Sequence, residues 1–109
     1  MKRGEIWTAS GGPDYAGKPR PVAIIQDDLF AGTASVTICA FTTDPTEAPI
    51  FRPVVDPSAS NGLLETSRLM ADKVTTVPRS KLGRKIGALD DTDVVRLNRA
   101  VLSFLGLVG

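Results

Sequence analysis

The chain has 109 residues, of which 42% are hydrophobic, and this length predicts a single domain, 1–109, with a modest core. The absence of histidine excludes a histidine acid–base pair, a Ser-His-Asp triad and a Cys/His zinc site. The net charge of +1 says little about partners. Since no apolar run reaches the length of a membrane span and no secretory signal opens the chain, we expect a cytoplasmic protein with no membrane partner.

The first half of the chain predicts three strands. Residues 4–9 alternate as a strand does, and residues 10–19 form a loop with three glycines and two prolines. Residues 21–26 are a buried strand, and residues 27–34 are irregular, with one helical turn around Leu29 and Phe30. Residues 35–42 form the third strand, in which Cys39 is expected to be a buried, inert thiol, and residues 43–49 are a proline-containing loop.

The second half predicts shorter strands and one helix. The expected elements are a weaker edge strand at 50–55 because of Pro53, a turn at 56–62, extended chain at 67–77, a helical turn at 78–81 and a strand at 84–89. Asp90 caps a helix that stops at Gly106. Its core stripe at 3–4 spacing consists of Val94, Leu97, Val101, Phe104 and Leu105. This pattern predicts a mainly β fold, a small barrel or curled sheet with a C-terminal helix.

Two features point to a charged ligand, and both have an ordinary explanation. Residues 27–65 carry six acids and one base, a balance of −5, whereas residues 66–89 carry six bases and one acid, a balance of +5. Such a basic segment is a nucleic-acid face or a solvated surface. Arg20 stands between Pro19 and Pro21, which stiffen the backbone at the mouth of a buried strand. A rigidly held guanidinium suits anion binding, although the same residues also fit a surface arginine.

Five segments occur in the order of a known family: RGEIW at 3–7, RPVAII at 20–25, AFT at 40–42, ADKVTTV at 71–77 and VLSFLGL at 101–107. Together they resemble the MazF/PemK (Kid) toxins of bacterial type II toxin–antitoxin modules over nearly the full length. The resemblance implies an SH3-like barrel (CcdB/Kid/MazF-like) with a C-terminal helix, assembled as a homodimer. It also implies inhibition by a cognate antitoxin of the MazE/PemI type, whose disordered acidic tail lies over the RNA groove.

The activity implied by the resemblance is a metal-independent endoribonuclease that needs no cofactor and cuts single-stranded RNA at short sequences. In that reaction the 2′-hydroxyl attacks the neighbouring phosphate and leaves a 2′,3′-cyclic phosphate and a 5′-hydroxyl. A guanidinium can stabilise the charge on the five-coordinate phosphorus, and a threonine hydroxyl can add a hydrogen bond. Because arginine stays protonated, we expect Arg20 to be an electrostatic stabiliser, or a general acid, rather than the base.

The resemblance places three residues in the catalytic site. Arg20 matches the family's catalytic arginine, and Thr42 matches the catalytic threonine that ends the third strand. Asp72 matches an acid that some PemK-like members use; it could orient Arg20, contact a base edge or be an ordinary surface acid. Two positions depart from the family. Tyr15 replaces an acid, and Met70 replaces the second functional arginine of the PemK branch.

RNA contacts are expected from aromatic, hydroxyl and basic side chains along the same surface. These residues are Tyr15, Lys18, Thr43, Lys73, Arg79 and Lys81, although the basic ones could equally serve solubility alone. Trp7 is expected to pack in the core or in a dimer interface.

Two other functions stay open from the sequence. CcdB-like toxins have the same barrel but bind and poison DNA gyrase, with the activity on the C-terminal helix; the Arg20 and Thr42 motif argues against this alternative. The departures at Tyr15 and Met70 also leave open an inactive or regulatory copy of the scaffold.

Overall fold

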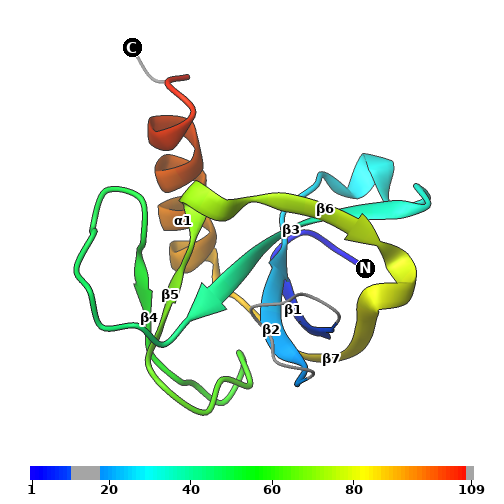
Figure 1. Cartoon of the computed structure of the whole chain (residues 1–109), viewed down its shortest axis with the longest axis horizontal. Helices are drawn as coiled ribbons and strands as arrows, with labels where there is room; N and C mark the ends of the chain where they lie inside the picture. The colour runs from blue at the N-terminus through cyan, green and yellow to red at the C-terminus, as the bar shows by residue number, and fades with distance from the viewer. Residues whose placement is uncertain (11–17, 108–109) are drawn as a thin grey trace.

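A computed structural model of the chain describes residues 1–10 and 18–107, which contain seven β-strands, three 3-10 turns and one α-helix (Figure 1). The strands are β1 (Glu5–Ala9), β2 (Arg20–Ile24), β3 (Ser35–Thr42), β4 (Val54–Val55), β5 (Ser67–Leu69), β6 (Thr75–Pro78) and β7 (Leu82–Ala88). The turns are η2 (Asp28–Phe30), η3 (Ala71–Lys73) and η4 (Arg79–Lys81), and the helix is α1 (Asp91–Phe104).

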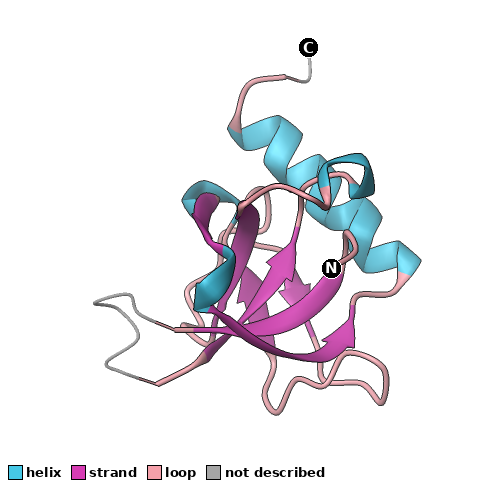
Figure 2. Ribbon diagram, turned by 90° about the vertical axis from the view of Figure 1, so that its right-hand side faces the viewer, coloured by secondary structure: helices cyan, strands magenta, loops and turns pink. Residues whose placement is uncertain are grey.

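The strands pair antiparallel and curl into an SH3-like barrel, with α1 outside the curled sheet (Figure 2). The strand order is β4-β5-β3-β2-β1-β7, and β6 pairs with β3 as well. One edge of β3 pairs with β2, while the other pairs with β6 along its first half and with β5 at its end. The predicted fold, mainly β with a C-terminal helix, is confirmed.

Alternate residues of β2 and β3 belong to two different hydrophobic clusters. Ala23 and Cys39 pack in a cluster that includes Leu97 of α1. Val22 and Ala40 pack in a second cluster, on the sheet face that β6 and β7 enclose. This separation follows from the two-residue period of a strand. A residue of β2 or β3 that lies two residues from Val22 or Ala40 along its strand therefore faces the same side, the concave side of the sheet.

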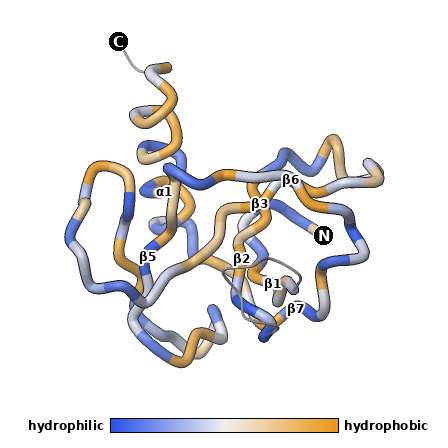
Figure 3. The backbone as a smooth tube through the Cα atoms, viewed as in Figure 1, coloured by the Kyte–Doolittle hydropathy of each residue, from blue (hydrophilic) through white to orange (hydrophobic). Residues whose placement is uncertain are grey.

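Helix α1 begins where the sequence predicts and buries one face. The Asp90 carboxylate accepts a hydrogen bond from the Asp93 N–H at 2.8 Å, which confirms the N-cap. Leu97 and Ala100 are buried, and Figure 3 shows hydrophobic and hydrophilic residues alternating along the helix. Extending the core stripe to the last turn was wrong, since Phe104 is 48% exposed and Leu105 57% exposed. This end of α1 projects beyond the sheet (Figure 1), so little is available there to cover it.

Two predicted strands differ from the structure. In the expected strand 50–55 only Val54 and Val55 pair, because the preceding residues turn, with the Arg52 N–H donating to the Ala48 carbonyl at 2.7 Å. The expected extended segment 67–77 is broken by η3. The break arises because β5 pairs with the end of β3 and β6 with its beginning, so the chain must step between them.

Most of the remaining local predictions agree with the structure, although β2 runs over Arg20–Ile24 instead of 21–26 and most of the predicted loop 10–19 lies outside the described residues. The helical turns at Leu29–Phe30 and 79–81 are present, and β7 begins two residues earlier than expected, at Leu82. Burial raises the pKa of the Cys39 thiol to about 12, in agreement with an inert thiol. Trp7 packs against the second cluster, and its Nε1 donates to Glu5 Oε1 at 3.0 Å. No helix in the described residues is long and apolar enough to cross a membrane.

Candidate active site

A groove of about 690 Å³ opens at the concave side of the sheet. Its floor is largely apolar and includes Ile38, Ala40, Met70 and Val77. Cationic and hydroxyl side chains complete the lining, namely Arg20, Lys73, Lys81, Ser10, Thr42, Thr43, Ser67 and Thr75. An apolar floor with cations beside it suits a ligand that combines flat rings with negative charge.

Arg20 and Thr42 come together in this groove because of strand register. The β2–β3 ladder pairs Val22 with Ala40, and Arg20 and Thr42 each lie two residues further along the same register. Both therefore belong to the concave face, and both line the groove. Arg20 is exposed and Thr42 is half-buried. Among the described residues none bonds the Arg20 guanidinium, a group whose five N–H donors suit an anion.

The Thr42 hydroxyl has a fixed hydrogen-bond partner. Its Oγ1 accepts the backbone N–H of Asp44 at 3.1 Å. The Asp44 carboxylate in turn accepts the backbone N–H and hydroxyl of Thr46, at 2.9 and 2.7 Å, and these bonds lower the pKa of Asp44. The loop after β3 therefore holds the Thr42 oxygen as an acceptor, so its own proton is available for donation into the groove.

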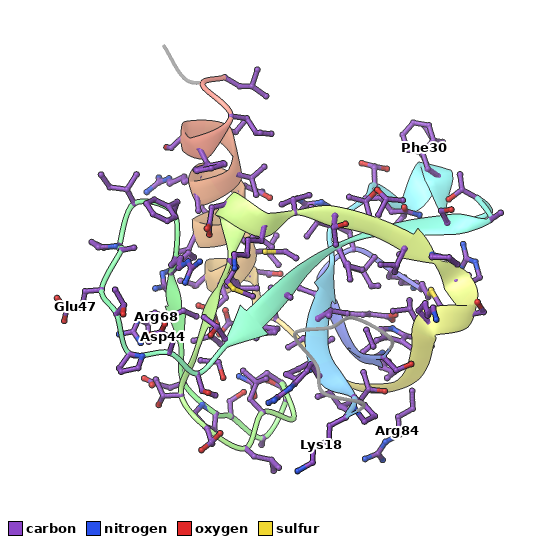
Figure 4. All side chains as sticks on the ribbon, in the orientation of Figure 1. Lys18, Phe30, Asp44, Glu47, Arg68 and Arg84 are labelled. Carbon is purple, nitrogen blue, oxygen red and sulfur yellow. The ribbon has the colours of Figure 1, made fainter. Side chains whose placement is uncertain are left out.

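The predicted RNA contacts divide between the groove and other places. Thr43, Lys73 and Lys81 line the groove. Lys18 is exposed but is not among the lining residues, and Figure 4 shows it at the same edge of the molecule as Arg84. Tyr15 lies outside the described residues.

Asp72 does not line the groove, although its neighbours Met70 and Lys73 do. Its carboxylate forms two hydrogen bonds with Arg52, Nε to Oδ1 at 3.0 Å and Nη2 to Oδ2 at 2.9 Å. The bonds from Arg52 lower the pKa of Asp72 and raise the pKa of Arg52. The sequence left three roles open for Asp72, one of which was to orient Arg20. In the described structure the arginine that Asp72 bonds is Arg52.

The Arg79 guanidinium is occupied within the fold. Its Nη2 donates to the carbonyl oxygens of Ala31 and Thr33, both at 2.6 Å, and its Nη1 lies 3.1 Å from the Met1 sulfur. Arg79 therefore anchors the turn after η2 to η4, and it does not line the groove. All three guanidinium nitrogens of Arg79 have partners within the fold, and the RNA contact expected from this residue stays a prediction.

Arg52 is the residue that sequence reasoning missed. It is the lone base in the acidic segment 27–65, which signals an acidic partner, but the sequence gives no means of choosing Asp72, 20 residues away. Serine and threonine at positions 10, 67 and 75 also line the groove without any local motif to mark them. No group of three or more His, Cys, Asp or Glu side chains that could hold a metal ion occurs in the described ranges.

Comparison with known proteins gives consistent results. Residues 2–105 match the family model described as "PemK-like, MazF-like toxin of type II toxin-antitoxin system". The chain is 55% identical over 109 residues, the full length of both proteins, to a protein of Mycolicibacterium smegmatis described as "Probable endoribonuclease MazF".

Two solved structures are similar over nearly their whole length. The Mycobacterium tuberculosis toxin MazF-mt6 has a TM-score of 0.79 and 29% identity, covering 94% of this chain and 96% of that one. A mycobacterial endoribonuclease in complex with its cognate antitoxin has a TM-score of 0.81 and 24% identity, covering 100% and 98% respectively. At that identity the second structure supports the fold alone.

Proposed function

The chain belongs to the PemK/MazF family of type II toxins and is a toxin endoribonuclease, and we propose that it cleaves single-stranded RNA at short sequences without a metal ion. The observation that carries this proposal is the meeting of Arg20 and Thr42 in one groove, which also holds Lys73 and Lys81. The cations of the groove suit the phosphates of RNA, and the apolar floor suits its unstacked bases.

In the proposed reaction the RNA supplies its own nucleophile. The 2′-hydroxyl loses its proton and its oxygen forms a bond to the neighbouring phosphorus, while the bond from phosphorus to the 5′-oxygen breaks and that oxygen takes up a proton. The products are a 2′,3′-cyclic phosphate and a 5′-hydroxyl. Arg20 donates to the phosphate oxygens and stabilises the added negative charge. The Thr42 hydroxyl donates a hydrogen bond to the same group, while its oxygen accepts from Asp44 N–H. DNA lacks the 2′-hydroxyl and is not cut.

Asp72 takes a supporting part in this mechanism. Its lowered pKa keeps it ionised at neutral pH, so it does not serve as a general acid there. Both of its oxygens accept from Arg52, and it is absent from the groove lining.

The proposed partners follow from the family and the charge of the groove. We infer a homodimer and a cognate antitoxin of the MazE/PemI type. An acidic antitoxin tail would meet Arg20, Lys73 and Lys81 in the same groove that receives RNA. Toxin inhibition would then be direct competition between two polyanions.

The gyrase-binding alternative of the CcdB type is not favoured, because the matching family model and the 55% identical relative both describe MazF-type toxins. An inactive copy of the scaffold predicts no cleavage of any RNA, and the following experiment distinguishes it.

The test is incubation of the purified protein with total RNA in excess EDTA, followed by mapping of the cleavage ends. We expect cuts at a recurring short sequence, 2′,3′-cyclic phosphate ends and no cleavage of DNA of the same sequence. Arg20→Ala and Thr42→Ala should each lose activity while keeping the wild-type thermal unfolding midpoint. Wild-type cleavage that requires Mg²⁺, or cleavage that survives both substitutions, would overturn the proposal.

A further inference from the structure

The Arg52–Asp72 ion pair is the most shielded charge contact in the described structure. Its two side chains are only 16% and 17% exposed, and two parallel N–H···O bonds join them. The other two ion pairs involve Lys85, which is 50% exposed, and Arg96, which is 41% exposed. A bidentate, shielded arginine–carboxylate pair fixes geometry more firmly than an exposed pair does.

This pair joins residues 51–55 to the segment that forms one side of the groove, from which Ser67, Met70 and Lys73 line it. Residues 51–55 run beside residues 67–71: Leu69 N–H donates to the Pro53 carbonyl at 3.0 Å and Ala71 N–H to the Phe51 carbonyl at 3.1 Å. The pair extends this connection to η3. Residues 44–50 connect Phe51 to Thr43 and Thr42, which line the groove.

The geometry of η3 explains why Asp72 lies outside the groove while its neighbours line it. In a 3-10 turn, side chains three residues apart lie on the same side. Met70 and Lys73 have this spacing and both line the groove. Asp72 faces the Arg52 side, and Ala71 is 2% exposed. Holding Asp72 therefore fixes the direction in which Met70 and Lys73 project.

The turn depends on this external contact because it is short and has no side-chain cap. It spans three residues, and Met70 at its N-cap position makes no side-chain hydrogen bond. Such turns are marginal without tertiary contacts. Besides the pair, η3 packs against α1 and β3, and the Ala71 N–H donates to the Phe51 carbonyl.

We propose that Arg52 is a positioning residue for the RNA groove, and that its bond with Asp72 sets the place of Met70 and Lys73 relative to Arg20 and Thr42. The inference rests on the proposed RNA cleavage at this groove. Neither member of the pair touches the reacting phosphate. The pair acts by fixing the groove wall against which the RNA lies.

The test is a double-mutant cycle with Arg52→Gln, Asp72→Asn and the combined variant. The substrate is a short RNA that spans a cleavage site mapped with the wild-type protein. Displacement of a groove wall by about an ångström predicts a loss of about tenfold to a hundredfold in kcat/KM. Both single variants should lose activity equally, and the combined variant should lose no more than either. Arg52→Lys should not restore activity, because lysine lacks the planar fork.

A matched control exists on α1, where Arg96 Nη1 and Asp93 Oδ1 form an ion pair at 2.8 Å away from the groove lining. Asp93→Asn should leave kcat/KM within about twofold of wild type, as expected for a site that does not contact the groove. A drop as large as that of Asp72→Asn would show that lost stability explains the effect and would overturn the proposal. Abolished cleavage in Asp72→Asn with near wild-type cleavage in Arg52→Gln would also overturn it, since Asp72 would then react itself.

Amide hydrogen exchange separates failure of this inference from failure of the proposed function. In Arg52→Gln the amides of Ala71 and Lys73 should exchange faster, while those of β2 and β3 stay protected. This result is expected whether or not the wild-type protein cuts RNA. Unchanged exchange at both amides would overturn the positioning role even in an active enzyme.

Discussion

Arg20 on β2 and Thr42 on β3 occupy corresponding positions of one antiparallel register, two residues beyond the paired Val22 and Ala40. The pairing of the two strands ends at Val22 and Ala40, and both Arg20 and Thr42 line the groove beyond it. A guanidinium and a hydroxyl placed in this way can reach the same phosphate from two strands. The rigid sheet therefore supplies the orientation that catalysis by charge stabilisation requires.

The hydroxyl of Thr42 gives the first prediction. Thr42→Val keeps the shape of the side chain but removes the donor, and should lower kcat by about a hundredfold to a thousandfold. Thr42→Ser retains the oxygen that accepts from Asp44 N–H and should keep most of the activity. Single-turnover cleavage of a mapped RNA measures both. Equal rates for the valine and serine variants would show that the hydroxyl takes no part.

The second prediction distinguishes basic residues in the groove from basic residues that stabilise the fold. Lys73→Ala and Lys81→Ala should each reduce the slope of log affinity against log salt by about 0.7, the value for one phosphate contact on a single strand. Arg79→Gln should leave the slope unchanged, because its guanidinium is bonded to backbone carbonyls. It should instead lower the free energy of unfolding by about 1–3 kcal/mol.

The salt titration uses an RNA whose cleaved nucleotide carries a 2′-deoxy sugar, so that binding is measured without reaction. Urea unfolding of Arg79→Gln provides the stability value. A reduced salt slope together with unchanged stability would place Arg79 at the RNA and contradict its structural role.

The third prediction concerns acid stability through Glu5. Burial acts to raise its pKa, but hydrogen bonds from Lys2 N–H and Trp7 Nε1, together with Lys85, outweigh burial and lower the pKa to about 2. Because the folded pKa lies below the unfolded one, the stabilisation is complete above about pH 4.5 and is lost as the pH falls toward 2.

The corresponding variant is Glu5→Gln. Relative to wild type it should lose at most about 3 kcal/mol of unfolding free energy at neutral pH, and the difference should shrink toward zero near pH 2. Urea unfolding across this range measures the difference. A difference that does not change with pH would show that Glu5 stabilises the fold without its charge.

The fourth prediction tests a close backbone approach at Gly62. This residue has a φ of +70°, and a Cβ atom there would collide with the carbonyl oxygen of Ile86. Gly62→Ala should therefore cost about 2 kcal/mol or more of unfolding free energy. Gly32 has no heavy atom within 4 Å of the same position, so Gly32→Ala is the control and should be neutral or slightly stabilising. Equal unfolding free energies for the two variants would contradict this account.

The sequence by itself determined those features that depend on neighbouring residues. The bounds of β3 follow from its β-branched first half and from the proline-containing loop after it, and the start of α1 follows from Asp90 as a cap. The predicted bounds were less accurate for the strand that contains Pro53 and for the extended segment that η3 interrupts. Where these strands begin and end depends on which neighbouring strand the chain pairs with. The family resemblance then selected Arg20 and Thr42 as site residues.

Only the tertiary structure decided which distant side chains meet. The register of β2 and β3 places Arg20 and Thr42 on one face, and the sequence does not state that register. Asp72 bonds Arg52, and Arg79 bonds the turn after η2, because the curl of the sheet brings these segments together. Local patterns encode secondary structure through periods and caps, whereas a contact between residues far apart depends on the path of the whole chain.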